Sequence, residues 1–275
     1  MAAPKTALGT RLAQLAQTEL AELNHQLERA RGGRDRALHK ARKTLQRLRA
    51  IVRLLQPIDA ALAMRENLRL RRLRRRLATL RDAAARCQTF RLLASRPRWK
   101  PHSVYLRALA AAEDQRHVEA WHAHPPESLF WDSIGRECVS LARRMAHWPF
   151  AALDKSALDN AVRQAEKRMQ RRVHDAQGEH GREPRHELRR KLRRYANVRR
   201  AAAVACGIED NDVERLLSLA QRCGHEGDLW MAVASARRAL RSEPELRTTA
   251  QALEAERRAL CRRDDRLLQR AGLER

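Results

Sequence analysis

The residues best suited to chemistry in this sequence are cationic side chains repeated at helical spacing. His39, Arg42, Lys43, Arg47 and Arg53 fall within about 80° of His39 if each residue turns the chain by about 100°. Arginine is always charged, and its planar guanidinium matches the oxygens of a phosphate group. This pattern predicts a helix with one face that binds phosphate-bearing anions.

The same kind of pattern occurs twice more. A stripe at i, i+4, i+7 and i+11 starts at Arg65, and a second basic segment surrounds His186. Together these segments predict the following anion-binding residues: His39, Arg42, Lys43, Arg47, Arg49, Arg53, Arg65, Arg69, Arg72, Arg76, Arg163, Lys167, Arg171, His186, Arg189, Arg190, Arg193 and Arg194.

Catalytic and metal-binding alternatives have weaker support in the sequence. His39 and His186 could act as general bases, but their place among cations favours a role as anion ligands. The histidines of HVEAWHAHPP lack the i, i+4 spacing of a metal site, and no CxxC motif accompanies Cys223. Asp82 and Asp228 are interpreted as helix N-caps. We therefore expect no enzymatic activity, no cofactor and no metal.

The positive charge is confined to two blocks of the sequence. The chain has 58 basic and 33 acidic residues, a net charge of +25. Residues 31–100 hold 22 basic and 4 acidic residues, a net +18, and residues 163–200 hold 14 and 5, a net +9. Self-repulsion of this size destabilises a compact monomer unless a partner offsets it. A polyanionic partner is therefore expected.

Composition and periodicity predict an all-α fold. Hydrophobic residues make up 43% of the chain, and their 3.6-residue spacing is interrupted at clusters of Gly, Pro and small polar residues. The expected helices span 5–31, 34–56, 58–95 (with a break near 79–82), 102–124, 127–146, 152–177, 184–206, 210–223, 226–242 and 244–271. No apolar run is long enough to cross a bilayer, so no membrane insertion is expected. Five dispersed cysteines indicate reduced thiols and a cytoplasmic location.

The two basic blocks resemble each other at an offset of 147 residues. This offset aligns His39 with His186, Arg47 with Arg194 and Arg53 with Arg200. The alignment predicts an internal duplication, with a first helical-bundle repeat at 1–126, a bridging helix at 127–148 and a second repeat at 149–275. The two repeats are expected to share a basic central surface.

The motifs of both blocks resemble the CHAD family, the conserved histidine α-helical domain. The resemblance rests on His39-x-x-Arg42-Lys43-x-x-x-Arg47, on Arg65-Glu66-Asn67, on Leu80-Arg81-Asp82 and on His186-x-x-Arg189-Arg190. It implies two pseudo-symmetric four-helix bundles, a basic surface that binds inorganic polyphosphate, and association with polyphosphate granules. Some members carry an adjoining triphosphate-tunnel domain with an ExExK motif, which does not occur in this sequence.

The leading hypothesis is non-enzymatic binding of inorganic polyphosphate, with RNA or DNA binding and a phosphohydrolase acting on polyphosphate as alternatives. Binding of single-stranded nucleic acid usually adds aromatic stacking, and the stretches 31–76 and 163–194 within the basic blocks contain no Trp or Phe, with only Tyr195 following them. This lack favours an anion without bases, although weak nucleic-acid binding remains compatible with the sequence. Oligomeric state, chain-length preference and granule partners are not predicted.

Overall fold

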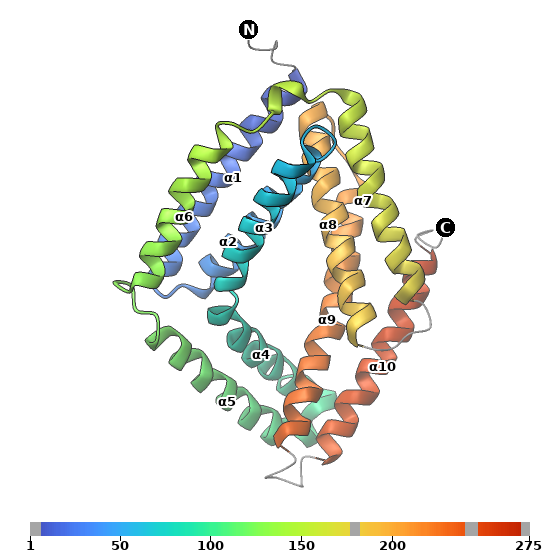
Figure 1. Ribbon diagram of the computed structural model, residues 1–275. Helices are drawn as coiled ribbons and strands as arrows, with labels where there is room; N and C mark the ends of the chain where they lie inside the picture. The colour runs from blue at the N-terminus through green and yellow to red at the C-terminus, as the bar shows by residue number, and fades with distance from the viewer. Residues whose placement is uncertain (1–6, 177–181, 240–246, 271–275) are drawn as a thin grey trace. The chain divides into compact units, whose positions relative to one another are not determined.

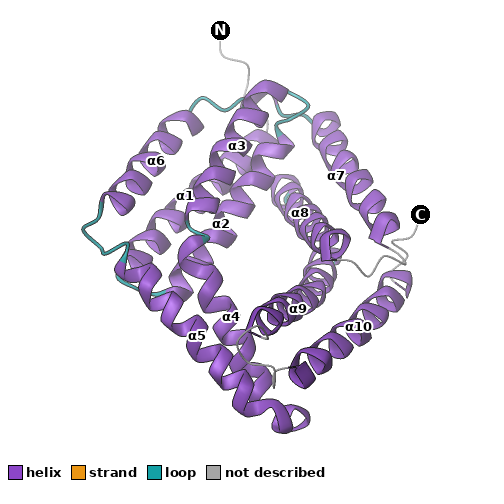
Figure 2. Ribbon diagram, turned by 60° about the horizontal axis from the view of Figure 1, so that its bottom comes forward, coloured by secondary structure: helices purple, strands orange, loops and turns teal. Residues whose placement is uncertain are grey.

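The computed structural model describes residues 7–176, 182–239 and 247–270, and within these ranges the chain is helical without any strand (Figures 1 and 2). The elements are α1 (Ala7–Arg31), α2 (Asp35–Leu54), α3 (Ala60–Arg76), α4 (Thr79–Ala94), η1 (Pro97–His102), α5 (Ser103–His122), α6 (Leu129–Met145), η2 (Phe150–Ala152), α7 (Lys155–Ala176), α8 (Arg182–Cys206), α9 (Asp212–Ala239) and α10 (Arg247–Arg270). The predicted all-α class is therefore confirmed.

The chain divides into two compact units whose segments interleave along the sequence. The first unit contains 1–79, 121–168 and 193–216, and the second contains 80–120, 169–192 and 217–275. The predicted repeats, in contrast, follow one another in the sequence. These units are defined by spatial contacts and the repeats by sequence similarity, so the duplication and its boundaries stay a prediction.

Helix α2 lies at the centre of the first unit, packed against α1 and α3 (Figure 1). Its apolar side is fully buried at Leu38, Leu45, Leu48 and Val52, which are the positions opposite the cationic face in the predicted helix. Burial of these side chains fixes the rotation of α2 about its axis. As a result, the positions of the cationic residues on the helix follow from the apolar pattern.

The turns around α2 use residues whose chemistry suits them. Gly33 has φ +81° and donates its N–H to the carbonyl of Ala30 at 2.9 Å, which closes α1 before α2 begins. At the start of α3, the Asp59 carboxylate accepts from the backbone N–H of Leu62 at 2.8 Å. The order α1, turn, α2, turn, α3 is therefore specified locally in the sequence.

The second unit has its own apolar core, formed by α4, η1, α5, α9 and α10. Phe90, Leu106, Val233 and Leu253 are fully buried in it, and Trp99 of η1 packs with them. These residues come from both ends of the unit's sequence, so the core joins segments that lie on either side of the second basic block.

Four sequence-based expectations differ from the structure, two in α3 and α4 and two in α9. The break in 58–95 lies at residues 77–78, earlier than expected, because Leu77 already packs into the core as the C-cap of α3. Asp82 lies in the first turn of α4 rather than at its N-cap, so that interpretation is wrong.

Residues 212–239 form one long helix, α9, where two helices at 210–223 and 226–242 were expected; residues 240–242 lie outside the described part of the chain. Asp228 lies inside this helix, so its interpretation as an N-cap is also wrong. The helix continues through Gly224 and Gly227, and Gly224 allows Arg189 to pack closely against α9. A Cβ at Gly224 would come within 3.0 Å of the Arg189 guanidinium carbon, so glycine makes room for that side chain.

Candidate anion-binding site

Two arginines of α2 converge on one amide oxygen of α3. Arg49 donates through Nε to Asn67 Oδ1 at 2.8 Å, and Arg53 donates through Nη2 to the same oxygen at 3.0 Å. Arg53 also donates to the carbonyl of Arg49 at 3.0 Å. Because Arg49 and Arg53 are one helical turn apart, they reach the same neighbour. Asn67 thereby holds two guanidinium groups side by side without neutralising either.

The surroundings of Arg53 are strongly cationic. Burial lowers the pKa of Arg53 well below its ordinary value, and the charges of Arg194, Arg49 and Arg168 lower it further. Within the described ranges Arg53 forms no ion pair with a carboxylate. Among the described residues, the charge of Arg53 itself is therefore met by polar oxygens only. We define Arg49, Arg53, Asn67 and Arg194 as the arginine cluster.

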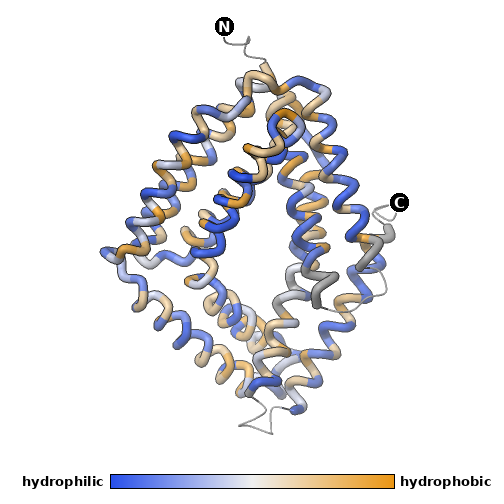
Figure 3. Tube along the Cα trace, viewed as in Figure 1, coloured by the Kyte–Doolittle hydropathy of each residue, from blue (hydrophilic) through white to orange (hydrophobic). Residues whose placement is uncertain are grey.

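The arginine cluster joins residues of both basic blocks within the first unit. Arg49 and Arg53 belong to α2, whereas Arg194 and Arg168 belong to α8 and α7. Figure 3 shows that much of α3 and the middle of α8 are hydrophilic. An anion seated here would contact charges that are far apart in the sequence.

The other predicted residues of α2 differ in their surroundings. His39 and Lys43 are exposed, and Arg42 is partly buried. Arg47 donates through Nε to Glu19 Oε1 at 2.6 Å and through Nη2 to Thr44 Oγ1 at 3.0 Å. Part of the predicted cationic face thus stabilises the packing of α2 on α1.

The predicted stripe on α3 is divided in the same way. Arg65 and Arg72 are exposed, while Arg69 pairs with the buried carboxylate of Glu66. Arg76 donates to Ser133 Oγ on α6 and lies 5.4 Å from the Phe130 ring centroid. The N-terminal part of the stripe is therefore available to a ligand, whereas Arg76 holds α6.

The predicted residues of α7 and α8 belong to both units. Arg163 and Lys167 are exposed, and Arg193 and Arg194 are partly buried, all in the first unit. Arg171 is exposed in the second unit, where Arg189 lies against Gly224 and Arg190 pairs with Glu187. The side chain of His186 lies outside the described residues. A surface shared by the two units stays a prediction.

Several residues of the site are missing from the sequence-based set. Asn67 occurs in the Arg65-Glu66-Asn67 motif, but only the structure shows that it accepts from two arginines. Glu66 is buried and accepts from Arg144 Nε at 3.0 Å and 3.2 Å, which joins α3 to α6. The sequence signal that could have identified Glu66 and Asn67 is an acidic residue next to an amide residue in an otherwise basic stretch.

Metal-ligand clusters, disulfides and membrane-spanning helices do not occur among the described residues. No group of three or more His, Cys, Asp or Glu side chains in the described ranges could hold a metal ion. None of the five cysteines forms a disulfide. No helix in the part of the chain that the structure describes combines the length and hydropathy needed to span a bilayer.

A comparison with protein families matches the CHAD domain model to residues 14–232. The chain belongs to the CHAD domain family. This match covers α2, α3, α7 and α8, and hence all residues of the arginine cluster. A comparison with curated protein sequences finds no significant match.

Two solved structures share the CHAD fold of this chain. The crystal structure of the CHAD domain from the plant Ricinus communis has 18% sequence identity and a TM-score of 0.62, covering 99% of this chain and 93% of that chain. PptA from Streptomyces chartreusis has 19% identity and a TM-score of 0.65, covering 96% of this chain and 98% of that chain. At these identities the similarity shows the fold alone.

Proposed function

We propose that this CHAD protein binds inorganic polyphosphate without catalysis and that the arginine cluster is its principal anchor. The carrying observation is the shared Asn67 oxygen, which holds Arg49 and Arg53 together beside Arg194 with no carboxylate paired to Arg53. A phosphate group placed there would replace charge repulsion by charge-assisted hydrogen bonds. Family membership supports the same ligand, and it supports association with polyphosphate granules in the cytoplasm.

A polymer of phosphates suits the remaining cations better than a single phosphate does. Lys43, Arg65, Arg72, Arg163 and Lys167 are exposed and form no ion pair within the described residues. They lie on α2, α3 and α7 of the first unit. Each successive phosphate of a chain carries negative charge and can contact one of these groups. The anchor would thus position a chain that peripheral cations bind more loosely.

Nucleic acid is the second candidate, since arginines also contact the phosphates of a duplex. No aromatic side chain belongs to the arginine cluster, so it offers no surface for base stacking.

Hydrolysis of polyphosphate is the third candidate. The basic blocks contain few carboxylates to hold Mg²⁺, so protein incubated with Mg²⁺ or Mn²⁺ should release no phosphate from polyphosphate. If wild-type protein releases phosphate and Arg53→Gln protein does not, the protein is an enzyme.

The proposal is tested by calorimetric titration of long-chain polyphosphate into wild-type and Arg53→Gln protein. Arg136→Gln is the matched control because Arg136 is exposed on α6 of the same unit and forms no ion pair within the described residues. Each variant loses one charge. We expect Arg53→Gln to weaken binding about tenfold and the control to change it much less. If the two variants weaken polyphosphate binding equally, the arginine cluster is not the principal anchor.

A further inference from the structure

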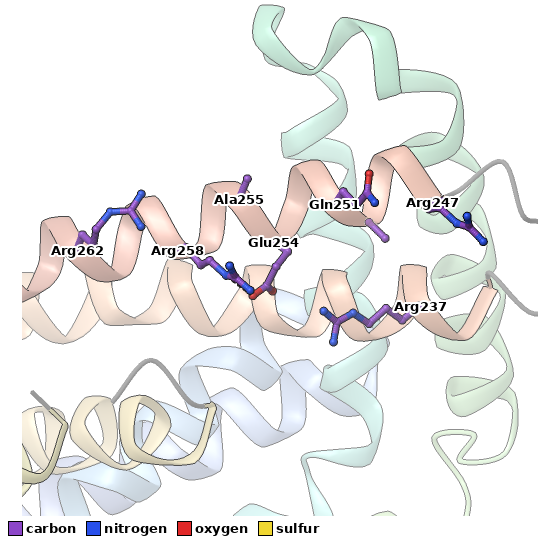
Figure 4. Close-up of a pocket in the computed structure, with 8 residues that line it drawn as sticks. Arg237, Arg247, Gln251, Glu254, Ala255, Arg258 and Arg262 are labelled. Atoms are coloured by element: carbon purple, nitrogen blue, oxygen red, sulfur yellow. Dashed lines mark hydrogen bonds and ion pairs between the residues drawn. The ribbon is translucent and has the colours of Figure 1, made fainter. Parts of the chain in front are cut away.

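A groove of about 540 Å³ lies in the second unit between α10 and the C-terminal end of α9 (Figure 4). Its polar lining consists of Arg237 from α9 and of Arg247, Gln251, Glu254, Arg258 and Arg262 from α10. All six follow residue 232, where the match to the CHAD domain model ends. The groove is therefore distinct from the arginine cluster of the first unit.

The charge of the groove is positive and mostly uncompensated. Arg237, Arg247 and Arg262 are exposed and form no hydrogen bond or ion pair with any other described residue. Glu254 is the one carboxylate among the described lining residues, and it accepts from Arg257 at 2.7 Å and from Arg258 at 3.0 Å. Its negative charge is thus already paired, which leaves three arginines to attract an anion.

The geometry of α10 aligns these groups on one side of the helix. Arg247, Gln251, Arg258 and Arg262 follow i, i+4, i+11 and i+15, a spacing that spans about 22 Å along the axis. The groove can therefore contact an elongated anion with several negative groups.

We propose that this groove is a second anion site, which binds a short oligophosphate. Its exposed cations are all arginines, whose planar forks fit phosphate oxygens. The apolar residues that line it are Ala250 and Ala255, which provide no anchor for the side chains of an acidic peptide. The described lining includes no aromatic ring to stack on a base, so the phosphates carry the recognition.

Tripolyphosphate is the probe for the test, titrated calorimetrically into the full chain. The variant is Arg247→Gln with Arg262→Gln, and the matched control is Arg136→Gln with Arg143→Gln, two exposed arginines of α6 in the first unit. Arg53→Gln is titrated in parallel to separate this site from the arginine cluster. We expect the groove variant to lose one class of sites or to bind it about tenfold more weakly, with the control close to wild type.

Two outcomes would overturn the proposal that the groove binds an oligophosphate. One is a groove variant that titrates as the control does. The other is an oligo-aspartate of equal charge that binds the groove as tightly as tripolyphosphate, which would indicate an acidic protein segment. A second measurement needs no variant. Tripolyphosphate should protect Arg247 and Arg262 from phenylglyoxal in wild-type protein, and equal modification with and without the probe would contradict the proposal.

Discussion

Arg53 on α2 and Arg194 on α8 lie close enough that the charge of Arg194 lowers the pKa of Arg53, although they belong to different basic blocks of the sequence. Arg49 and Asn67 fix the position of Arg53 by hydrogen bonds. Such proximity of like charges is unfavourable without an anion. The free protein therefore holds a cationic cluster that a ligand can relieve.

This relationship predicts a trade-off between stability and binding at Arg53. Replacement by methionine removes a partly buried charge, while Asn67 Oδ1 still accepts from Arg49. We expect Arg53→Met to raise the free energy of unfolding by about 1 kcal/mol at low salt and to weaken polyphosphate binding. Urea unfolding at two salt concentrations measures the effect, which should shrink as salt screens the repulsion. If Arg53→Met protein is less stable than wild type at low salt, the repulsion around Arg53 is unimportant.

Binding through many arginine–phosphate contacts should depend steeply on salt. A polyanion releases counterions when cationic side chains replace them, so the affinity falls as the salt concentration rises. We expect the dissociation constant for long-chain polyphosphate to increase at least about tenfold between 50 and 200 mM salt. Fluorescence anisotropy with labelled polyphosphate provides the measurement. A constant affinity over this range would contradict the electrostatic mechanism.

Glu66 is predicted to stabilise the first unit by pairing with Arg144. Glu66 is 3% exposed, and its carboxylate joins α3 to α6. Its removal in Glu66→Ala leaves the partly buried Arg144 with Glu137 and Ser140 as partners. We expect a loss of about 2 kcal/mol in the free energy of unfolding, measured by urea. Glu66→Gln, which keeps an acceptor oxygen, is the control and should lose less; equal stability of Glu66→Ala and wild type would refute the role.

Ionisation of Tyr195 is expected to lower the stability of the protein at alkaline pH. Burial, followed by the charge of Glu166, raises its pKa from 10.0 to about 12, and its hydroxyl donates to Glu166 Oε1 at 3.1 Å. Because the unfolded phenol loses its proton first, this contribution is constant below about pH 10 and decreases as the pH rises from 10 towards 12. The free energy of unfolding of Tyr195→Phe should lack that decrease. Tyr105→Phe is the control, and an equal pH dependence of both variants would contradict the assignment.

Local patterns in the sequence predict the helices well but not the partners of individual arginines. The apolar spacing of Leu38, Leu45, Leu48 and Val52 fixes the buried side of α2, and the structure buries these residues. In contrast, Arg47 pairs with Glu19 on another helix. No periodicity distinguishes such an arginine from an exposed one, because its partner is set by tertiary packing.

Glycine gives the clearest case of a misleading local signal. Gly224 and Gly227 interrupt the apolar pattern and indicate a break, yet α9 continues through both. The close approach of Arg189 explains the glycine at position 224, and it is visible only when α8 and α9 are placed together. Packing in the second unit therefore overrides the low helix propensity of these residues.

The most direct test of the central claim is a competition between long-chain polyphosphate and duplex DNA at equal charge concentration for the same protein. The arginine cluster offers forked cations without aromatic rings, and a bare phosphate chain can approach it without bases or sugars. We expect polyphosphate to displace labelled DNA at a lower charge concentration than unlabelled DNA does, and Arg53→Gln to reduce that advantage. A clear preference for DNA, unaffected by Arg53→Gln, would contradict polyphosphate as the ligand.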